Sequence, residues 1–248
     1  MMKASLHLVL DIGNTQTKYG LFQNNIRTDS GVCSDWNETQ WKNFTEKKPI
    51  STILIGSVGA STKHLLHYLP KQSRVFFVDH TTQYPFTSKY QDINTLGVDR
   101  RAAITGGMTL FPQKPLLVID AGSCITYDYI DAAAVHHGGA IAPGRAMRYQ
   151  ALHLCTAALP LEKPTHDIPQ LGTSTNSSMQ YGVEFGVIAE INSQIEHFSE
   201  KFGDFTTILT GGDADFLIKK IKNGIFANTD LNLIGLHRLL IFNKLHEK

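Results

Sequence analysis

The chain of 248 residues carries 23 Lys plus Arg against 22 Asp plus Glu, a formal net charge of +1, and 42% of its residues are hydrophobic. This composition excludes a disordered chain, because low net charge with many apolar side chains favours burial of a core. The balanced charge leaves no electrostatic footprint for nucleic acid or an anionic membrane, so we expect neither as a partner. The length suits one large domain or two smaller ones.

The cysteines and the apolar segments indicate the cellular compartment in which the protein resides. Cys33, Cys124 and Cys155 are widely spaced and form no C-x-x-C pair, so neither a disulfide framework nor a zinc cluster is expected. The first residues lack the apolar stretch of a signal peptide, and about 18 consecutive apolar residues occur nowhere. We therefore expect a cytoplasmic protein.

A β-hairpin is predicted first along the chain, from an apolar run that ends in Asp11-Ile12-Gly13 and a second run from Thr17 to Phe22. Gly13 and Asn14 tolerate backbone conformations that other residues avoid, so the turn can present N–H groups as an anion-binding nest. The donors and the acid that we assign to this candidate phosphate site are Asp11, Ile12, Gly13, Asn14, Thr15, Gln16, Thr17 and Lys18. A carboxylate beside a phosphate indicates a divalent cation between them. The alternative is an ordinary hairpin whose turn Asp11 caps.

The same pattern recurs 109 residues later. Residues 117–126 match residues 8–17 in register at Leu, Val, Asp, Gly and Thr, which places Asp120, Gly122 and Ser123 in a second predicted hairpin. A second echo relates residues 52–57 to residues 207–212, in the same order along the chain. Two ordered echoes indicate a duplicated α/β unit. We predict two similar domains, residues 1–113 and 114–248, whose two acid-bearing hairpins face one nucleotide cleft.

Two further segments are candidate ligand sites. Gly211 and Gly212 end an apolar run and would let a flat ring or sugar approach the backbone, although a plain strand–turn–helix joint, with Asp213 as helix cap, is equally compatible. Gly97-Val98-Asp99-Arg100 precedes a helix of small residues. There Arg100 could bind a carboxylate while Asp99 accepts a proton, or the two could form only a helix cap and a surface ion pair.

Helices are predicted between these segments. An apolar stripe of helical period runs from Met179 to Phe202 and ends at Gly203, and a second helix is predicted over residues 146–159. The glycine-rich stretch 136–145 either covers a ligand or joins a hairpin to the second of these helices. The P-loop motif, any G-x-G and the G-x-S-x-G elbow are absent from the sequence, so a bound nucleotide requires another architecture.

In combination these motifs resemble the acetate and sugar kinase, Hsp70 and actin superfamily, and within it the type III pantothenate kinases. The resemblance is carried by Asp-x-Gly-Asn-Thr-x-x-Lys at Asp11, Asp-x-Gly-Ser at Asp120, Gly-x-Asp-Arg at Gly97, Gly-Gly-x-Ile-x-Pro-Gly at Gly138 and a late Thr-Gly-Gly at Thr210. It implies an α/β fold of two ribonuclease-H-like, actin-like domains, each a mixed β-sheet flanked by helices. Ser123 stands where threonine is usual, and Arg101 replaces an aromatic residue.

The resemblance also implies a reaction and its residues. The family phosphorylates pantothenate with ATP to 4′-phosphopantothenate, the first step of coenzyme A biosynthesis. Asp99 would be the proton acceptor, and the pantothenate site would consist of Tyr90, Gly97, Val98, Asp99, Arg100 and Thr175. Residues 11–18 and Ser123 would bind the phosphates, and Gly211 and Gly212 the adenosine. Asp11 would hold Mg²⁺ through water, Asp120 would bind a monovalent cation, K⁺ or NH₄⁺, and the second domain would form a homodimer interface.

Two alternatives share this fold. One is a catalytically inactive, nucleotide-binding transcription accessory factor of the same family, against which the retained Asp11, Asp99, Arg100 and Asp120 argue. The other is a kinase that acts on a sugar or a small carboxylate.

Overall fold

The computed structural model describes residues 6–46, 48–57, 66–221 and 225–247. The chain folds into two compact units, which we describe separately: the first comprises Met1–Gln113, Ala133–His136 and Asp230–Lys248, and the second Lys114–Ala132 and His137–Thr229. These units differ from a simple division at residue 113, because the C-terminal segment packs with the first. The division into domains 1–113 and 114–248 therefore stays a prediction about the duplicated sequence.

The first unit is built on a five-stranded sheet in the order β3-β2-β1-β4-β5. Its strands are β1 (Leu6–Ile12), β2 (Thr17–Gln23), β3 (Ile26–Val32), β4 (Ile50–Ser57) and β5 (Arg74–Phe77). The predicted hairpin is present: β1 and β2 are antiparallel, with Asp11 opposite Lys18. The echo segment lies in β4, which runs parallel to β1 and places Gly56 beside Asp11.

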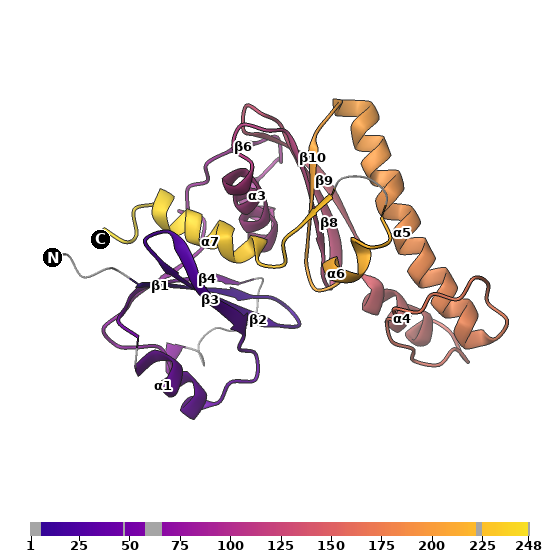
Figure 1. The fold of residues 1–248 in the computed structure, drawn as a ribbon, viewed down its shortest axis with the longest axis horizontal. Coiled ribbons are helices and arrows are strands. Elements are labelled where there is room, and N and C mark those ends of the chain that lie inside the picture. The colour runs from indigo at the N-terminus through magenta and orange to yellow at the C-terminus, as the bar shows by residue number, and fades with distance from the viewer. Residues whose placement is uncertain (1–5, 47, 58–65, 222–224, 248) are drawn as a thin grey trace. The chain divides into compact units, whose positions relative to one another are not determined.

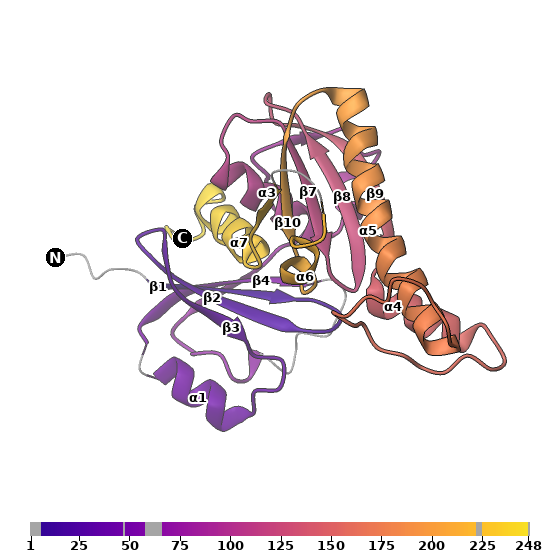
Figure 2. The same cartoon turned by 45° about the vertical axis from the view of Figure 1, so that its right-hand side comes forward.

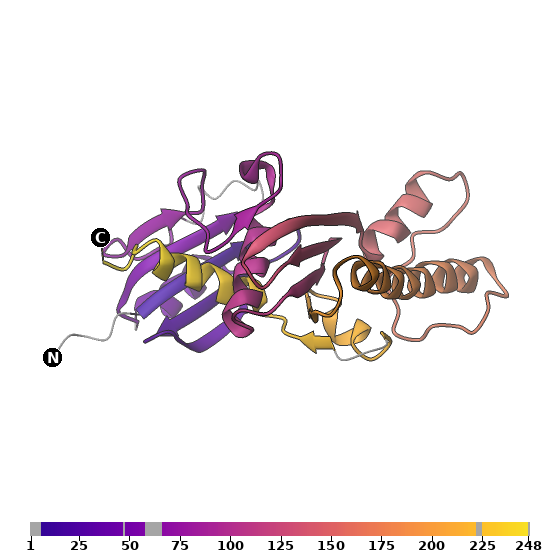
Figure 3. The same cartoon turned by 90° about the horizontal axis from the view of Figure 1, so that it is seen from above.

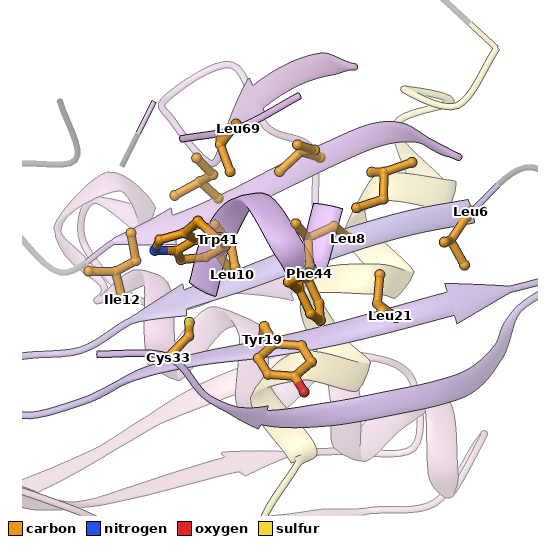
Figure 4. Close-up of a cluster of buried hydrophobic side chains, with 13 residues drawn as sticks. Leu6, Leu8, Leu10, Ile12, Tyr19, Leu21, Cys33, Trp41, Phe44 and Leu69 are labelled. Carbon is orange, nitrogen blue, oxygen red and sulfur yellow. The ribbon is translucent and has the colours of Figure 1, made fainter. Parts of the chain in front are cut away.

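Helices cover both faces of this sheet. Successive side chains of β1 point to opposite faces, and those on both faces are buried. Leu8 and Leu10 point to the face covered by α1 (Glu38–Glu46), where they pack with Trp41 and Phe44 (Figure 4). Val9 points to the opposite face and packs against α7 (Leu231–Phe242). There α7 lies beside α3 (Val98–Leu110), although more than 120 residues separate them in sequence (Figures 1 and 2).

The second sheet repeats the plan of the first. Its strands are β7 (Leu116–Ala121), β8 (Cys124–Ile130), β9 (Val135–Pro143), β10 (Thr206–Thr210) and β11 (Ile225–Ala227), with the two-residue β6 (Thr87–Ser88) at the edge. The order β9-β8-β7-β10-β11 corresponds strand for strand to β3-β2-β1-β4-β5. The second predicted hairpin is β7–β8, with Asp120 opposite Thr126, and β10 runs parallel to β7. The duplication is therefore confirmed at the level of topology.

The helices of the second unit follow the predicted stripe closely. The long helix α5 (Thr175–Phe202) packs Val187 and Ile191 against the sheet and ends at Gly203, whose φ is 77°. The helix α4 (Arg145–Leu154) lies beside it (Figure 3). The prediction of a helix over 146–159 was wrong at its end, because the helix stops at Leu154 and Cys155 is its C-cap. No helix within the described residues is long and apolar enough to span a membrane.

Candidate active site

The first hairpin turn is tighter than its sequence suggests. The N–H of Gly13 donates to the carbonyl of Gln16 at 3.0 Å, and the N–H of Thr17 donates to Ser34 Oγ at 2.7 Å. Among the described residues, the positive φ angles include neither Gly13 nor Asn14, so the turn does not use the left-handed conformation that these residues tolerate. The backbone hydrogen bond closes the turn without it. The side chains of Asn14, Thr15 and Gln16 are exposed at its tip.

Asp11 lies at the end of β1 in an environment that disfavours its charge. Burial raises the pKa of Asp11 to about 6, and the nearby charge of Asp99 adds to the rise. A long hydrogen bond of 3.4 Å from Asn232 Nδ2, together with Lys18, opposes it. Two acids held near each other in a partly buried setting are the arrangement that a bound cation relieves.

Asp99 lies in the first turn of α3, and the orientation of its carboxylate depends on the glycine two residues before it. Gly97 is the N-cap of the helix, and Asp99 Oδ1 accepts a hydrogen bond from the backbone N–H of Arg100 at 2.8 Å. A Cβ at position 97 would lie 2.4 Å from that oxygen, closer than any side chain tolerates. The spacing of the Gly-x-Asp-Arg motif therefore has a steric cause: only glycine leaves room for this carboxylate in the orientation seen here.

Of the residues predicted to bind pantothenate, Arg100 lies near Tyr90 in the first unit. The guanidinium of Arg100, which is 5% exposed, lies 5.7 Å from the centroid of the Tyr90 ring. The buried ring of His136 stacks on that of Tyr90, with the two centroids 6.3 Å apart. Ser88 Oγ joins the two residues, because it binds His136 Nδ1 at 2.8 Å and accepts the N–H of Tyr90 at 3.1 Å. Arg101 points instead to Tyr84, 4.9 Å from its ring.

The second hairpin turn is enclosed by two glycines from distant motifs. Gly144, from the glycine-rich stretch, donates its N–H to the carbonyl of Ser123 at 3.1 Å, and a Cβ there would lie 2.3 Å from the carbonyl oxygen of Gly122. Gly211 approaches from β10 with a φ of 96°, and its Cβ would lie 2.5 Å from Asp120 Oδ1. The second unit thus brings three predicted motifs together at Asp120. The side chain of Ser123 is exposed there.

Two predicted residues are placed differently from the rest. Thr175 is the exposed first residue of α5 and belongs to the second unit, whereas Tyr90 and Gly97–Arg100 belong to the first. Asp213 holds the N-cap position of the short helix α6 (Ala214–Leu217), as the sequence suggests. Its side chain does not cap, because Asp213 Oδ1 accepts a hydrogen bond from Arg145 Nη1 at 2.8 Å.

The donor set suits a hard cation bound mainly through phosphate. Within the described part of the chain, no group of three His, Cys, Asp or Glu side chains can hold a metal by itself. Magnesium commonly binds through one or two carboxylates, water and substrate phosphates, and Asp11 near Asp99 supplies such carboxylates. The residues present therefore fit a magnesium–nucleotide complex.

Comparisons with known proteins show the family of this chain. The sequence model of the family "Type III pantothenate kinase" matches residues 7–197. Type III pantothenate kinases of Flavobacterium psychrophilum and Christiangramia forsetii are 37% and 39% identical over 239 and 242 residues, covering 96% of this chain and 99% of each relative. Two solved structures share the fold. A protein described as a Baf family transcriptional activator from Campylobacter jejuni has a TM-score of 0.60 and 23% identity, and the match covers 96% of this chain and 99% of that one. The ethanolamine utilization protein EutJ from Carboxydothermus hydrogenoformans has a TM-score of 0.55 and 9% identity, and the match covers 97% of this chain and 91% of that one.

Two sheets of equivalent topology, each with an Asp-x-Gly hairpin, define the duplicated α/β fold of the acetate and sugar kinase, Hsp70 and actin superfamily. The family match, the near-complete coverage and the Gly-x-Asp-Arg segment narrow the assignment further. The chain belongs to the type III pantothenate kinase family.

Sequence reasoning missed several residues that support these sites. Asn232 reaches Asp11 from α7, and His136 and Ser88 position Tyr90. Arg145 and Glu184 form a buried ion pair between α4 and α5. The contacts of Asn232, His136 and Arg145 join segments far apart in sequence, so no local spacing reveals their partners. Ser88 lies two residues before Tyr90 but stands in none of the motifs. The only local signal was the glycine-rich stretch that ends at Arg145.

Proposed function

We propose that this chain transfers the γ-phosphoryl group of ATP to the primary hydroxyl of pantothenate, giving 4′-phosphopantothenate, the first step of coenzyme A biosynthesis. Family membership supports the reaction. The observation that carries the proposal is the placement of Asp99 close enough to Asp11 that its charge affects the pKa of that carboxyl. Asp11 then binds the metal–phosphate complex, and Asp99 binds the hydroxyl that is phosphorylated.

Asp99 orients the hydroxyl of pantothenate and accepts its proton during phosphoryl transfer. Its contact with the backbone N–H of Arg100 fixes the carboxylate in one orientation. A general base of this kind typically contributes about 10²–10⁴-fold to the rate. Arg100 pairs with the carboxylate of pantothenate, and Tyr90, Gly97 and Val98 line the rest of its site. Thr175 completes this substrate set.

The phosphates are bound by residues of both hairpins. Asp11, through water, holds Mg²⁺ on the nucleotide, and residues 12–18 and Ser123 supply N–H, hydroxyl and Lys18 donors for the phosphate oxygens. When bound, Mg²⁺ neutralises charge on those oxygens. Gly211 and Gly212 allow the adenosine to approach the backbone. Asp120, enclosed by Gly122 and Gly211, binds a monovalent cation, K⁺ or NH₄⁺.

The second unit also carries an apolar surface that suits a second copy of this chain. Phe185, on α5, is 52% exposed and stacks on Tyr181 with centroids 5.2 Å apart. Leu154, at the end of α4, is 78% exposed. Exposed apolar clusters of this kind mark interfaces. We propose a homodimer that forms through α4 and α5, and a cytoplasmic location, where ATP is supplied.

A coupled assay of ADP release across pantothenate, hexoses and acetate tests this function. Release with pantothenate alone is the expected result. Release with a hexose or acetate instead would establish the sugar or small-carboxylate kinase, and ATP binding without release from any substrate would establish the accessory factor. The retained Asp11, Asp99 and Asp120 argue against the accessory factor, because a protein without phosphoryl transfer does not need them.

A further inference from the structure

We propose that Arg145 is a positioning residue for the nucleotide. It holds the side chain of Asp213 and so fixes the Gly211–Asp213 loop. Loss of this contact therefore weakens the binding of ATP and leaves the binding of pantothenate unchanged. This inference rests on the proposed function in one respect, the assignment of Gly211 and Gly212 to the adenosine.

Arg145 is buried at the start of α4 with every guanidinium nitrogen engaged. Its side chain is 1% exposed. Nε donates to Glu184 Oε2 at 2.5 Å, Nη1 to Asp213 Oδ1 at 2.8 Å, and Nη2 to the carbonyl of Thr165 at 2.6 Å. The guanidinium also lies 3.9 Å from the centroid of the Phe216 ring. One cation therefore joins four segments of the second unit.

Glu184 anchors this cation independently of Asp213. It is completely buried on α5 and also accepts hydrogen bonds from Tyr149 Oη and from the N–H of Thr165, both at 3.0 Å. A buried carboxylate with three donors, one of them cationic, is fully compensated. The position of Arg145 is thus set by Glu184, and Asp213, which is 26% exposed, is the partner that this fixed cation orients.

Asp213 connects the cation to the loop that is assigned to the nucleotide. It directly follows Gly211 and Gly212, and its backbone N–H donates to the carbonyl of Ala121 at 3.0 Å. The loop is therefore held at two points: its backbone at the end of β7, and its side chain at Arg145. An ordinary strand–turn–helix joint would use this aspartate as a cap. Here the carboxylate turns away to the buried cation, which fixes the direction of the loop.

A loop that is fixed before binding does not lose its freedom when the ligand arrives. Asp213→Asn removes the charge-assisted bond and leaves Arg145 paired with Glu184 and Thr165. A hydrogen bond to a charged group is worth enough for its loss to weaken binding about tenfold. The matched control is Asp215→Asn, because Asp215 is an exposed acid in the same short helix.

Titration calorimetry on the full chain with Mg²⁺ tests the proposal. We expect Asp213→Asn to raise the Kd of ATP about tenfold, Asp213→Glu to restore most of the affinity, and Asp215→Asn to match the parent protein. Inorganic triphosphate, which has no adenosine, should bind the parent and Asp213→Asn equally. In steady-state assays KM for ATP should rise while KM for pantothenate stays unchanged.

Arg145→Lys is the second variant, since its ammonium keeps a charge against Glu184 but lacks the fork that also reaches Asp213 and Thr165. Arg145→Lys should weaken the binding of ATP as much as Asp213→Asn does. Unchanged ATP affinity in both variants, or an equal loss for ATP and inorganic triphosphate, would overturn the proposal. A parent protein that binds ATP but does not phosphorylate pantothenate would refute the proposed function alone, because the comparison of ATP affinities would still decide the role of Arg145.

Discussion

The carboxylate of Asp99 occupies the space that a side chain at position 97 would need: a Cβ on Gly97 would lie 2.4 Å from Asp99 Oδ1. The glycine of the motif is thus a steric requirement of this orientation of the Asp99 carboxylate, two residues further along at the same end of α3. This relationship links a sequence pattern to the orientation of a single functional group.

Gly97→Ala should therefore impair catalysis more than folding. The added methyl group forces Asp99 to another rotamer, so we expect kcat to fall by at least about tenfold, with ATP affinity unchanged. Steady-state kinetics with calorimetry of ATP binding measure both quantities. A variant with the parent kcat would show that the orientation of Asp99 in this structure is not the one used in the reaction.

The raised pKa of Asp11 predicts a pH dependence of stability. Its pKa of about 6 lies above the ordinary value of 3.8 because burial and the charge of Asp99 disfavour ionisation. The folded protein then binds more protons than the unfolded chain between these two values, so the free energy of unfolding falls as pH rises from about 4 to 6 and stays lower above that range. At neutral pH the ionised Asp11 therefore lowers the free energy of unfolding of the ligand-free protein.

Asp11→Asn should remove this loss of stability. At pH 8, without nucleotide, we expect the variant to be more stable than the parent protein by on the order of 1–2 kcal/mol, and at pH 4 by much less. Urea unfolding at both pH values measures the difference, and Asp35→Asn, at an exposed acid, is the control. Activity should respond in the opposite sense, with a higher Mg²⁺ requirement. Equal stability of variant and parent at both pH values would contradict the raised pKa.

Asp120→Asn should abolish activation by monovalent cations. In the parent protein we expect K⁺ or NH₄⁺ to raise kcat, because the carboxylate supplies the charge that holds the cation near the phosphates. Initial rates across KCl and NH₄Cl titrations, at constant ionic strength, measure the effect. A variant that is still activated to the parent level would exclude Asp120 as the cation ligand.

Phe185→Glu should dissociate the proposed homodimer. A charge in the centre of an apolar interface loses its hydration without gaining a partner, so we expect the dimer Kd to rise by about tenfold or more. Sedimentation analysis over a range of protein concentration measures it. Phe226→Glu is the control, because Phe226 is 54% exposed but lies on β11, outside α4 and α5. If both variants sediment as the parent does, this surface is not the interface.

Local sequence patterns were sufficient to predict part of the fold. The two hairpins and the end of α5 at Gly203 follow from periodicity and glycine signals that act within a few residues. The return of the C-terminal helix to the first sheet was not predictable, since Asn232 meets Asp11 only through tertiary packing. The ion pair of Arg145 with Glu184 was missed for the same reason, and the expected capping by Asp213 was wrong because a buried cation competes for its carboxylate.

The most direct test of the central claim is the formation of 4′-phosphopantothenate by the parent protein and by Asp99→Asn, followed by mass spectrometry with ATP, Mg²⁺ and K⁺ present. The account predicts product from the parent, turnover lower by about 10²–10⁴-fold in the variant, and nearly equal ATP affinity in both. Product formed by Asp99→Asn at the parent rate, or no product from the parent, would contradict it.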